Sequence, residues 1–204
     1  MQIRRALVVP VTLVALIGAG LGGLANALNN PDTIVPTMND SDACGAGSLG
    51  SADPCQTDNR SLTYFMTGSL PQSARDQVNL VLNQMYDTTV LNVSYESPAV
   101  YTGSSETDIV YQQGTVPGSD TGYTWCDDPN GFYTCDQQYI QVESGSWTKG
   151  LTCHETGHAV GLVHGQRAFP AVPNNDPSLK CMEKPTPATD NLGDNNKDNI
   201  NATY

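Results

Sequence analysis

The chain has 204 residues and is strongly acidic, with 21 aspartates and glutamates against nine lysines and arginines and a formal net charge of −12. Such a surface disfavours binding to nucleic acid and to anionic membranes. The length suits one domain with a single hydrophobic core, and we expect a monomer.

The N-terminal residues have the layout of a secretory signal peptide. Arg4 and Arg5 precede an apolar run over residues 6–17, and small residues follow up to an Ala-Asn-Ala motif that ends at Ala27. This pattern predicts a signal peptide over residues 1–27, cleaved after its last alanine. A membrane anchor is disfavoured because four glycines dilute the end of the apolar run. We therefore expect a secreted, extracellular protein with no membrane attachment after cleavage.

The six cysteines all follow the predicted signal peptide, and their number is even. In an oxidising compartment this indicates three disulfides. Short spacings favour the pairs Cys44–Cys55 and Cys126–Cys135, which leaves Cys153–Cys181 as the third. Other connectivities are open.

The next segment, residues 28–59, is rich in Asn, Asp, Gly, Ser and Pro and predicts a loop-rich N-terminal segment. From residue 60 onwards the pattern becomes regular. Residues 61–67 favour a strand, and proline in the first turn permits a helix over about 71–86. Its apolar residues recur at steps of three and four, which predicts one buried face: Ala74, Val78, Val81, Leu82 and Met85.

The second half of the chain predicts more strands and two further helices. The expected strands are 89–95, 108–112, 123–126, 133–135 and 138–142, with 123–126 and 133–135 forming a hairpin around a turn at 127–131. A helix follows Ser144-Gly145-Ser146, and Leu192, Ile200 and Tyr204 suit one face of a C-terminal helix within 190–204. This order predicts an α+β domain with a mixed sheet.

All three histidines of the chain lie in the stretch HETGHAVGLVHG, residues 154–165. His154 and His158 are four residues apart, so on a helix their imidazoles share one face and can both reach a zinc ion. Glu155 would sit beside this pair. It could hold a zinc-activated water and take its proton, which makes it the candidate catalytic base.

Gly161 and His164 complete the pattern. Glycine tolerates the left-handed conformation that ends a helix, so the chain can turn there and bring His164 back to the same metal. Three neutral imidazoles leave a fourth position open, which is typical of catalytic rather than structural zinc. The sequence thus predicts one catalytic Zn²⁺ bound by His154, His158 and His164.

These residues fit His-Glu-x-x-His-x-x-Gly-x-x-His and resemble the signature of the metzincins, a family of zinc endopeptidases. The family has a methionine-containing turn beneath the metal, and Met182 is the only methionine after the motif. The resemblance implies a zincin-like catalytic domain over residues 60–204. That domain would have a mixed twisted sheet, a long helix, a catalytic helix and a C-terminal helix. Size and secretion signal resemble those of small secreted actinobacterial metalloproteases.

Two positions depart from the family pattern. Lys184 stands where some metzincins have a tyrosine that stabilises the oxyanion, so no tyrosine role is carried over. Gly165 follows the third histidine and assigns no subfamily. Cys153 would point about 100° around the helix from His154, which makes it a poor fourth ligand. A disulfide from it to Cys181 would tie the catalytic helix to the methionine turn.

The sequence therefore predicts a secreted zinc metalloendopeptidase that acts on a protein or peptide substrate, with Glu155 as general base. Two alternatives are a hydrolase of cell-wall peptides or other amides, and a non-catalytic secreted protein that binds zinc. A thiolate of Cys44 or Cys55 could also cap the zinc in a latent form. The acidic composition permits Ca²⁺, but no calcium-loop motif is present.

Overall fold

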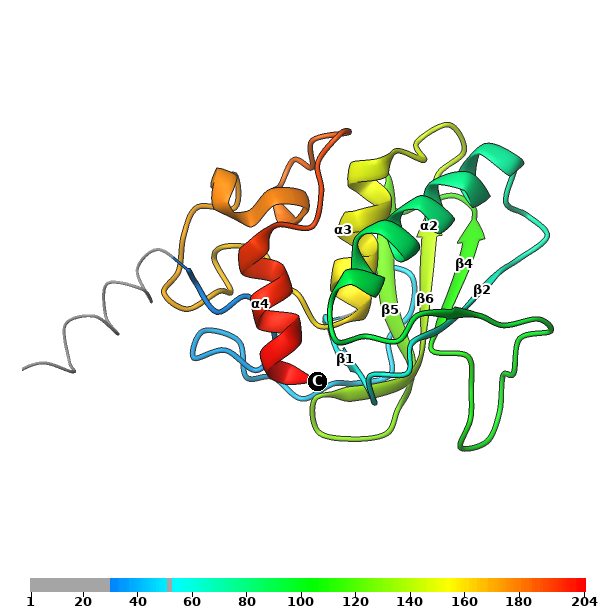
Figure 1. Ribbon diagram of the computed structural model, residues 1–204, viewed down its shortest axis with the longest axis horizontal. Coiled ribbons are helices and arrows are strands. Elements are labelled where there is room, and N and C mark those ends of the chain that lie inside the picture. The colour runs from blue at the N-terminus through cyan, green and yellow to red at the C-terminus, as the bar shows by residue number, and fades with distance from the viewer. Residues whose placement is uncertain (1–29, 51–52) are drawn as a thin grey trace, which may run out of the picture.

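The computed structural model describes residues 30–50 and 53–204, so the predicted signal peptide lies outside the described residues. Within that part of the chain, every helix is too short or too polar to cross a membrane. The architecture is α+β, with three α-helices and two 3-10 segments around one mostly parallel sheet in the described residues (Figure 1).

Six strands form the sheet in the order β1-β6-β4-β2-β3, and β5 pairs with β6. The strands are β1 (Gln56–Thr57), β2 (Thr63–Met66), β3 (Ser94–Tyr95), β4 (Ile109–Gln113), β5 (Gly122–Pro129) and β6 (Thr134–Val142). The pairings β1–β6, β4–β6, β2–β4 and β2–β3 are parallel, whereas β5 runs antiparallel to β6. The predicted mixed sheet is confirmed.

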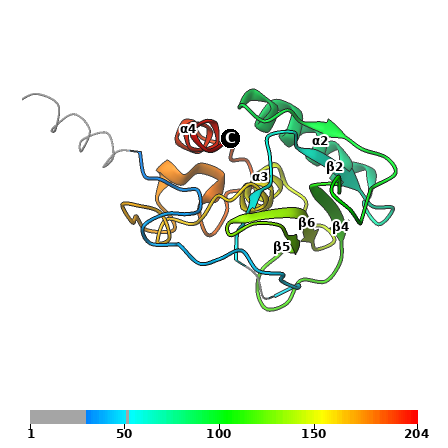
Figure 2. The same cartoon turned by 90° about the horizontal axis from the view of Figure 1, so that it is seen from below.

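The helices are α2 (Gln72–Gln84), α3 (Lys149–Ala159) and α4 (Asp194–Thr203), and the 3-10 segments are η1 (Tyr86–Thr88) and η2 (Pro177–Met182). Figures 1 and 2 show α2 and α3 on the same face of the sheet, with α4 further from the strands. The predicted apolar face of α2 is buried against this sheet. The C-terminal helix is also confirmed, because Leu192 and Ile200 are buried and Tyr204 packs against the core.

Two expectations about strands were wrong. Residues 89–95 form no continuous strand: α2 runs into η1, and only Ser94–Tyr95 pairs with the sheet. The reason is that the first N–H groups of this segment have other partners: the Thr89 N–H donates to the Tyr86 oxygen, and the Val90 N–H donates to Asn201 Oδ1. Residues 133–135 and 138–142 are not separate strands but parts of one strand, β6.

The N-terminal segment contributes to the sheet and the core. β1 lies within residues 28–59 and pairs in parallel with the start of β6. Ile34 and Val35 are buried, and Ile34 forms a β-bridge with Leu162. All three expected disulfides are present. One of them, Cys126–Cys135, closes the β5–β6 hairpin.

Replacing Leu82 by Ala should lower the free energy of unfolding by about 2–5 kcal/mol, because this fully buried side chain leaves a cavity beneath α2. Leu80 on the same helix is only partly buried, so Leu80→Ala is a matched control with a smaller expected loss. Urea unfolding followed by circular dichroism measures both variants, and equal losses would contradict the burial of the α2 face.

Candidate metal centre

A side-chain cap and a glycine explain where α3, the helix that carries the motif, begins and ends. The Thr148 side chain caps α3 by accepting a hydrogen bond from the Leu151 N–H at 3.2 Å. At the other end Gly161 has φ of +89°, a conformation that side chains other than glycine rarely adopt. A Cβ at this position would also lie 3.0 Å from the Gln56 side chain. The expected sharp turn after α3 is therefore present at Gly161.

The turn brings His164 back to the two histidines of α3. The three rings lie with centroids 4.7–4.9 Å apart, and their candidate ligand nitrogens all lie within 4.8 Å of one another. The two Nε2 atoms of His154 and His158 are 3.1 Å apart. The three histidines that the sequence singled out thus share one site.

The other nitrogen of each ring faces a backbone carbonyl. His154 Nδ1 lies 2.6 Å from the Cys181 oxygen, His158 Nδ1 lies 2.8 Å from the Leu162 oxygen, and His164 Nδ1 lies 3.1 Å from the Met182 oxygen. A carbonyl only accepts, so each Nδ1 carries the hydrogen and each Nε2 is left with a lone pair. Such outer contacts fix the tautomer and orientation of metal-binding imidazoles.

Burial keeps these imidazoles neutral. It lowers the pKa of His154 to about 3, with the neighbouring His164 adding to the shift, and it lowers the pKa of His158 well below its ordinary value. The pKa of His164 is also lowered, mainly by burial. Neutral imidazole is the form that binds a metal ion, so the site is set for a cation.

The segment with Met182 lies directly beneath α3. Met182 is fully buried, and its Sδ lies 2.3 Å from where a Cβ would stand at Gly157 of the helix. The close approach of α3 to this segment therefore depends on glycine at position 157. Met182 therefore packs under α3, and its carbonyl oxygen faces His164; that this segment is a methionine turn stays a prediction.

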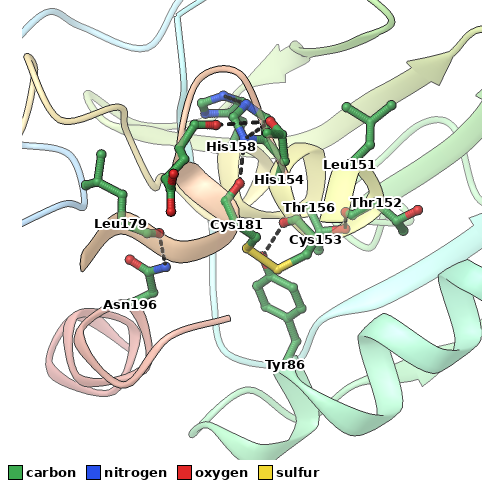
Figure 3. Close-up of a disulfide and its surroundings, with 12 residues drawn as sticks. Tyr86, Leu151, Thr152, Cys153, His154, Thr156, His158, Leu179, Cys181 and Asn196 are labelled. Carbon is green, nitrogen blue, oxygen red and sulfur yellow. Dashed lines mark hydrogen bonds between the residues drawn. A yellow bond between two sulfur atoms is a disulfide. The ribbon is translucent and has the colours of Figure 1, made fainter. Parts of the chain in front are cut away.

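A disulfide joins α3 to the same segment. Cys153, next to the first histidine, bonds to Cys181, whose carbonyl accepts from His154 (Figure 3). On the far side of the disulfide the buried Tyr86 hydroxyl donates to the Cys153 carbonyl at 2.7 Å. The crosslink thus fixes a histidine and its hydrogen-bond acceptor relative to each other.

Glu155 projects towards β5. Its side chain is buried, and the Thr124 hydroxyl donates to its Oε2 at 2.7 Å. Burial raises the pKa of Glu155 to about 7, with the hydrogen bond from Thr124 opposing the shift and Asp120 adding to it. A carboxylate with a pKa near neutrality can both take and return a proton.

The histidines and Glu155 line one cavity of about 560 Å³. One side is formed by residues that precede and begin β5, including Asp120, Gly122 and Thr124. The other side includes Leu151 of α3 and the segment after Met182, including Lys184 and Thr186. At the rim, Lys184 Nζ lies 3.4 Å from an Asp120 carboxylate oxygen.

Other candidate residues lie elsewhere. Cys44 and Cys55 are bonded to each other, so the suggestion that either caps the zinc as a thiolate is wrong for this disulfide-bonded form. Carboxylate oxygens of Glu106, Asp128 and Asp136 lie within 4.8 Å of one another at a separate place, but exposed acidic groups are commonly found together without an ion.

Sequence reasoning missed the residues around Glu155. Thr124 lies 31 residues earlier in the chain, and no spacing rule connects it to the motif. Thr186 was missed for the same reason, although its hydroxyl lies 2.9 Å from His154 Nδ1. The antiparallel pairing of β5 with β6 brings the Thr124 hydroxyl to the site, and the chain after η2 brings that of Thr186.

Comparison with protein-family models and with curated proteins gave no match. Among solved structures, the chain is similar to one described as "Crystal Structure of metalloproteinase-II from Bacteroides fragilis", with 16% sequence identity and a TM-score of 0.40. The match covers 86% of this chain and 59% of that chain, so this chain spans less than two thirds of that protein's length.

In the metal-free protein, Glu155→Gln should stabilise the fold at pH 8 but not at pH 4.5. Because the folded pKa is about 7 against an ordinary 4.5, the wild type loses stability as pH rises between these values, whereas glutamine does not titrate. The difference should reach at most about 3 kcal/mol. Thermal unfolding with a chelator measures it, and a difference that is equal at both pH values would contradict the burial of a titrating carboxyl.

Removing the disulfide with Cys153→Ala and Cys181→Ala should destabilise the protein by about 2–5 kcal/mol and, if the three histidines bind added Zn²⁺, weaken that binding about 10- to 100-fold. The reason is that the crosslink holds the carbonyl that orients His154. Competition with a chromogenic chelator measures the affinity. The control is removal of the Cys126–Cys135 bond, which should reduce stability without a comparable loss of zinc. Unchanged affinity in the first variant would count against the positioning role.

Proposed function

We propose that this protein is a secreted zinc-dependent endopeptidase of the metzincin type that hydrolyses peptide bonds in proteins. The observation that carries the proposal is the convergence of the three histidine side chains beside the buried carboxyl of Glu155 in one cavity. Three disulfides support the extracellular location, because such bonds persist in oxidising compartments.

The donor set fits zinc. His154, His158 and His164 would hold the ion through their Nε2 atoms, since each Nδ1 faces a carbonyl. Three neutral imidazoles with a position left for water or substrate are typical of catalytic zinc. When bound there, zinc lowers the pKa of a water molecule and polarises the carbonyl of the peptide bond.

Glu155 is the group that moves the proton. As the oxygen of the attacking water forms a bond to the carbonyl carbon, the carboxylate of Glu155 takes the proton from that water. As the carbon–nitrogen bond breaks, Glu155 returns the proton to the nitrogen of the leaving amine. Its raised pKa of about 7 suits both halves of this transfer near neutral pH.

Strand β5 offers a place for an extended substrate. Among the described strands it pairs with β6 alone, so it forms an edge of the sheet. Its first residues, including Gly122 and Thr124, line the same cavity as the histidines. An extended peptide can add to such an edge through main-chain hydrogen bonds. This agrees with the resemblance to metzincins, which implies a substrate bound along an edge strand.

Replacing Glu155 by Gln should retain one zinc per chain and reduce hydrolysis at least about 100-fold, because glutamine cannot take the proton. His164→Ala, in contrast, should lose zinc because it removes one of the three imidazoles. Metal analysis and cleavage of casein and a peptide library, with and without a chelator, measure both effects.

Three outcomes would contradict the proposal in different ways. Unchanged turnover in Glu155→Gln would show that Glu155 is not the general base. Cleavage of cell-wall peptide but not of casein or library peptides would point to a cell-wall hydrolase. Bound zinc without hydrolysis of any substrate would indicate a zinc-binding protein that is not an enzyme.

A further inference from the structure

The orientation of the Glu155 side chain is set from outside its own helix. Helix α3 fixes the backbone of this residue, but the glutamate side chain keeps several rotatable bonds. A proton-transfer group that is misplaced by about 1 Å can lose about 100-fold in rate. The contacts that hold this carboxyl therefore matter for the proposed reaction, and they come from the start of β5.

Thr124 supplies a hydrogen bond to this carboxyl. Its hydroxyl lies 2.7 Å from Glu155 Oε2 and 3.0 Å from the backbone oxygen of the same residue. In the hairpin Thr124 stands opposite Ile140, which is fully buried under the helices. Residues directly opposite each other share a face of the sheet, so the hydroxyl points towards α3 because of its strand register.

Gly122 supplies room for the same carboxyl. It lies two residues before Thr124 on the same face of β5, opposite the buried Val142. A Cβ at position 122 would stand 2.5 Å from Glu155 Oε1 and 2.9 Å from both Cδ and Cγ of that side chain. Real atoms do not approach so closely, so the Glu155 carboxyl occupies the space that any side chain at position 122 would need.

We propose that Gly122 and Thr124 form a carboxylate seat that positions Glu155 for proton transfer, an inference that rests on the proposed function. Thr124 holds Oε2 through its hydroxyl, and Gly122 leaves the space in which Oε1 lies. Oε1 is then the oxygen that takes the proton from the attacking water and returns it to the leaving nitrogen. Both residues are positioning residues, since they act through Glu155.

A purely structural role for Thr124 predicts a different result. If Thr124 only tied β5 to α3 through the backbone oxygen of Glu155, its loss would reduce stability and disturb zinc binding. If it orients the carboxyl, its loss will reduce kcat while zinc content and KM stay close to those of the wild type. Serine keeps the hydroxyl and valine keeps the shape, so these two substitutions separate the hydroxyl from the packing.

In the zinc-loaded protein, Thr124→Val should lower kcat about 30- to 100-fold with one zinc retained, whereas Thr124→Ser should stay within about threefold of the wild type. Gly122→Ala should also lower kcat, because its Cβ displaces the carboxyl. Thr134→Val, on β6 and away from the cavity, is the control and should leave kcat unchanged. A full kcat in Thr124→Val beside an inactive Glu155→Gln would overturn the seat and leave the proposed function standing.

A second measurement does not depend on turnover. A peptide hydroxamate binds zinc and shares its hydroxyl hydrogen with a carboxylate beside the metal, so its affinity reports the orientation of Glu155. Calorimetry should show binding weakened at least about tenfold in Thr124→Val and restored in Thr124→Ser. If the wild type hydrolyses no peptide, the proposed function fails, and equal hydroxamate affinity in wild type and Thr124→Val would overturn the seat by itself. A wild type that neither hydrolyses peptides nor binds the hydroxamate overturns both.

Discussion

The candidate metal centre depends on three imidazole N–H groups that each face a backbone carbonyl. A charged imidazole in a buried place is unfavourable, two charged imidazoles so close would repel each other, and an unpaired N–H there would also be unfavourable. The carbonyls of Cys181, Leu162 and Met182 pair these N–H groups, since they accept the Nδ1 hydrogens and leave the Nε2 lone pairs inside the cluster. Burial keeps the imidazoles uncharged, because it lowers the pKa of each of them. Two of these carbonyls belong to η2 and one to the turn after α3. The site therefore exists only when α3, its terminal turn and η2 are packed together.

Much of the surrounding structure holds those three elements. The Cys153–Cys181 bond and the close packing of Met182 against Gly157 join η2 to α3. The N-terminal segment secures the turn from the other side: Val163 N–H donates to the Thr33 oxygen, and the Val35 N–H donates to the oxygen of Gly161. A segment that reads as irregular thus pairs like a strand against the loop that carries the third histidine.

Local patterns in the sequence were sufficient for the parts of the site that lie close together in the chain. The spacing of His154 and His158, and the need for glycine at position 161, follow from helix geometry alone. The apolar face of α2 was predictable for the same reason. The strand expected over 89–95 was wrong because β-propensity does not reveal that the Thr89 and Val90 N–H groups bond to Tyr86 and Asn201 instead of to the sheet. Thr124 could not be found, because its link to Glu155 depends on the β5–β6 register.

The ion pair between Lys184 and Asp120 at the cavity rim affects access to the three histidines. Lys184 and Asp120 are each about half exposed, at 53% and 47% of their side-chain surface. Such pairs contribute little, typically about 0–1 kcal/mol, and dissolved salt weakens them further. The two segments that border the opening are therefore joined by a weak contact, which a molecule that enters the cavity can displace. Deeper in the cavity His154 and Glu155 are buried and hydrogen-bonded, so that part is held more firmly than the rim.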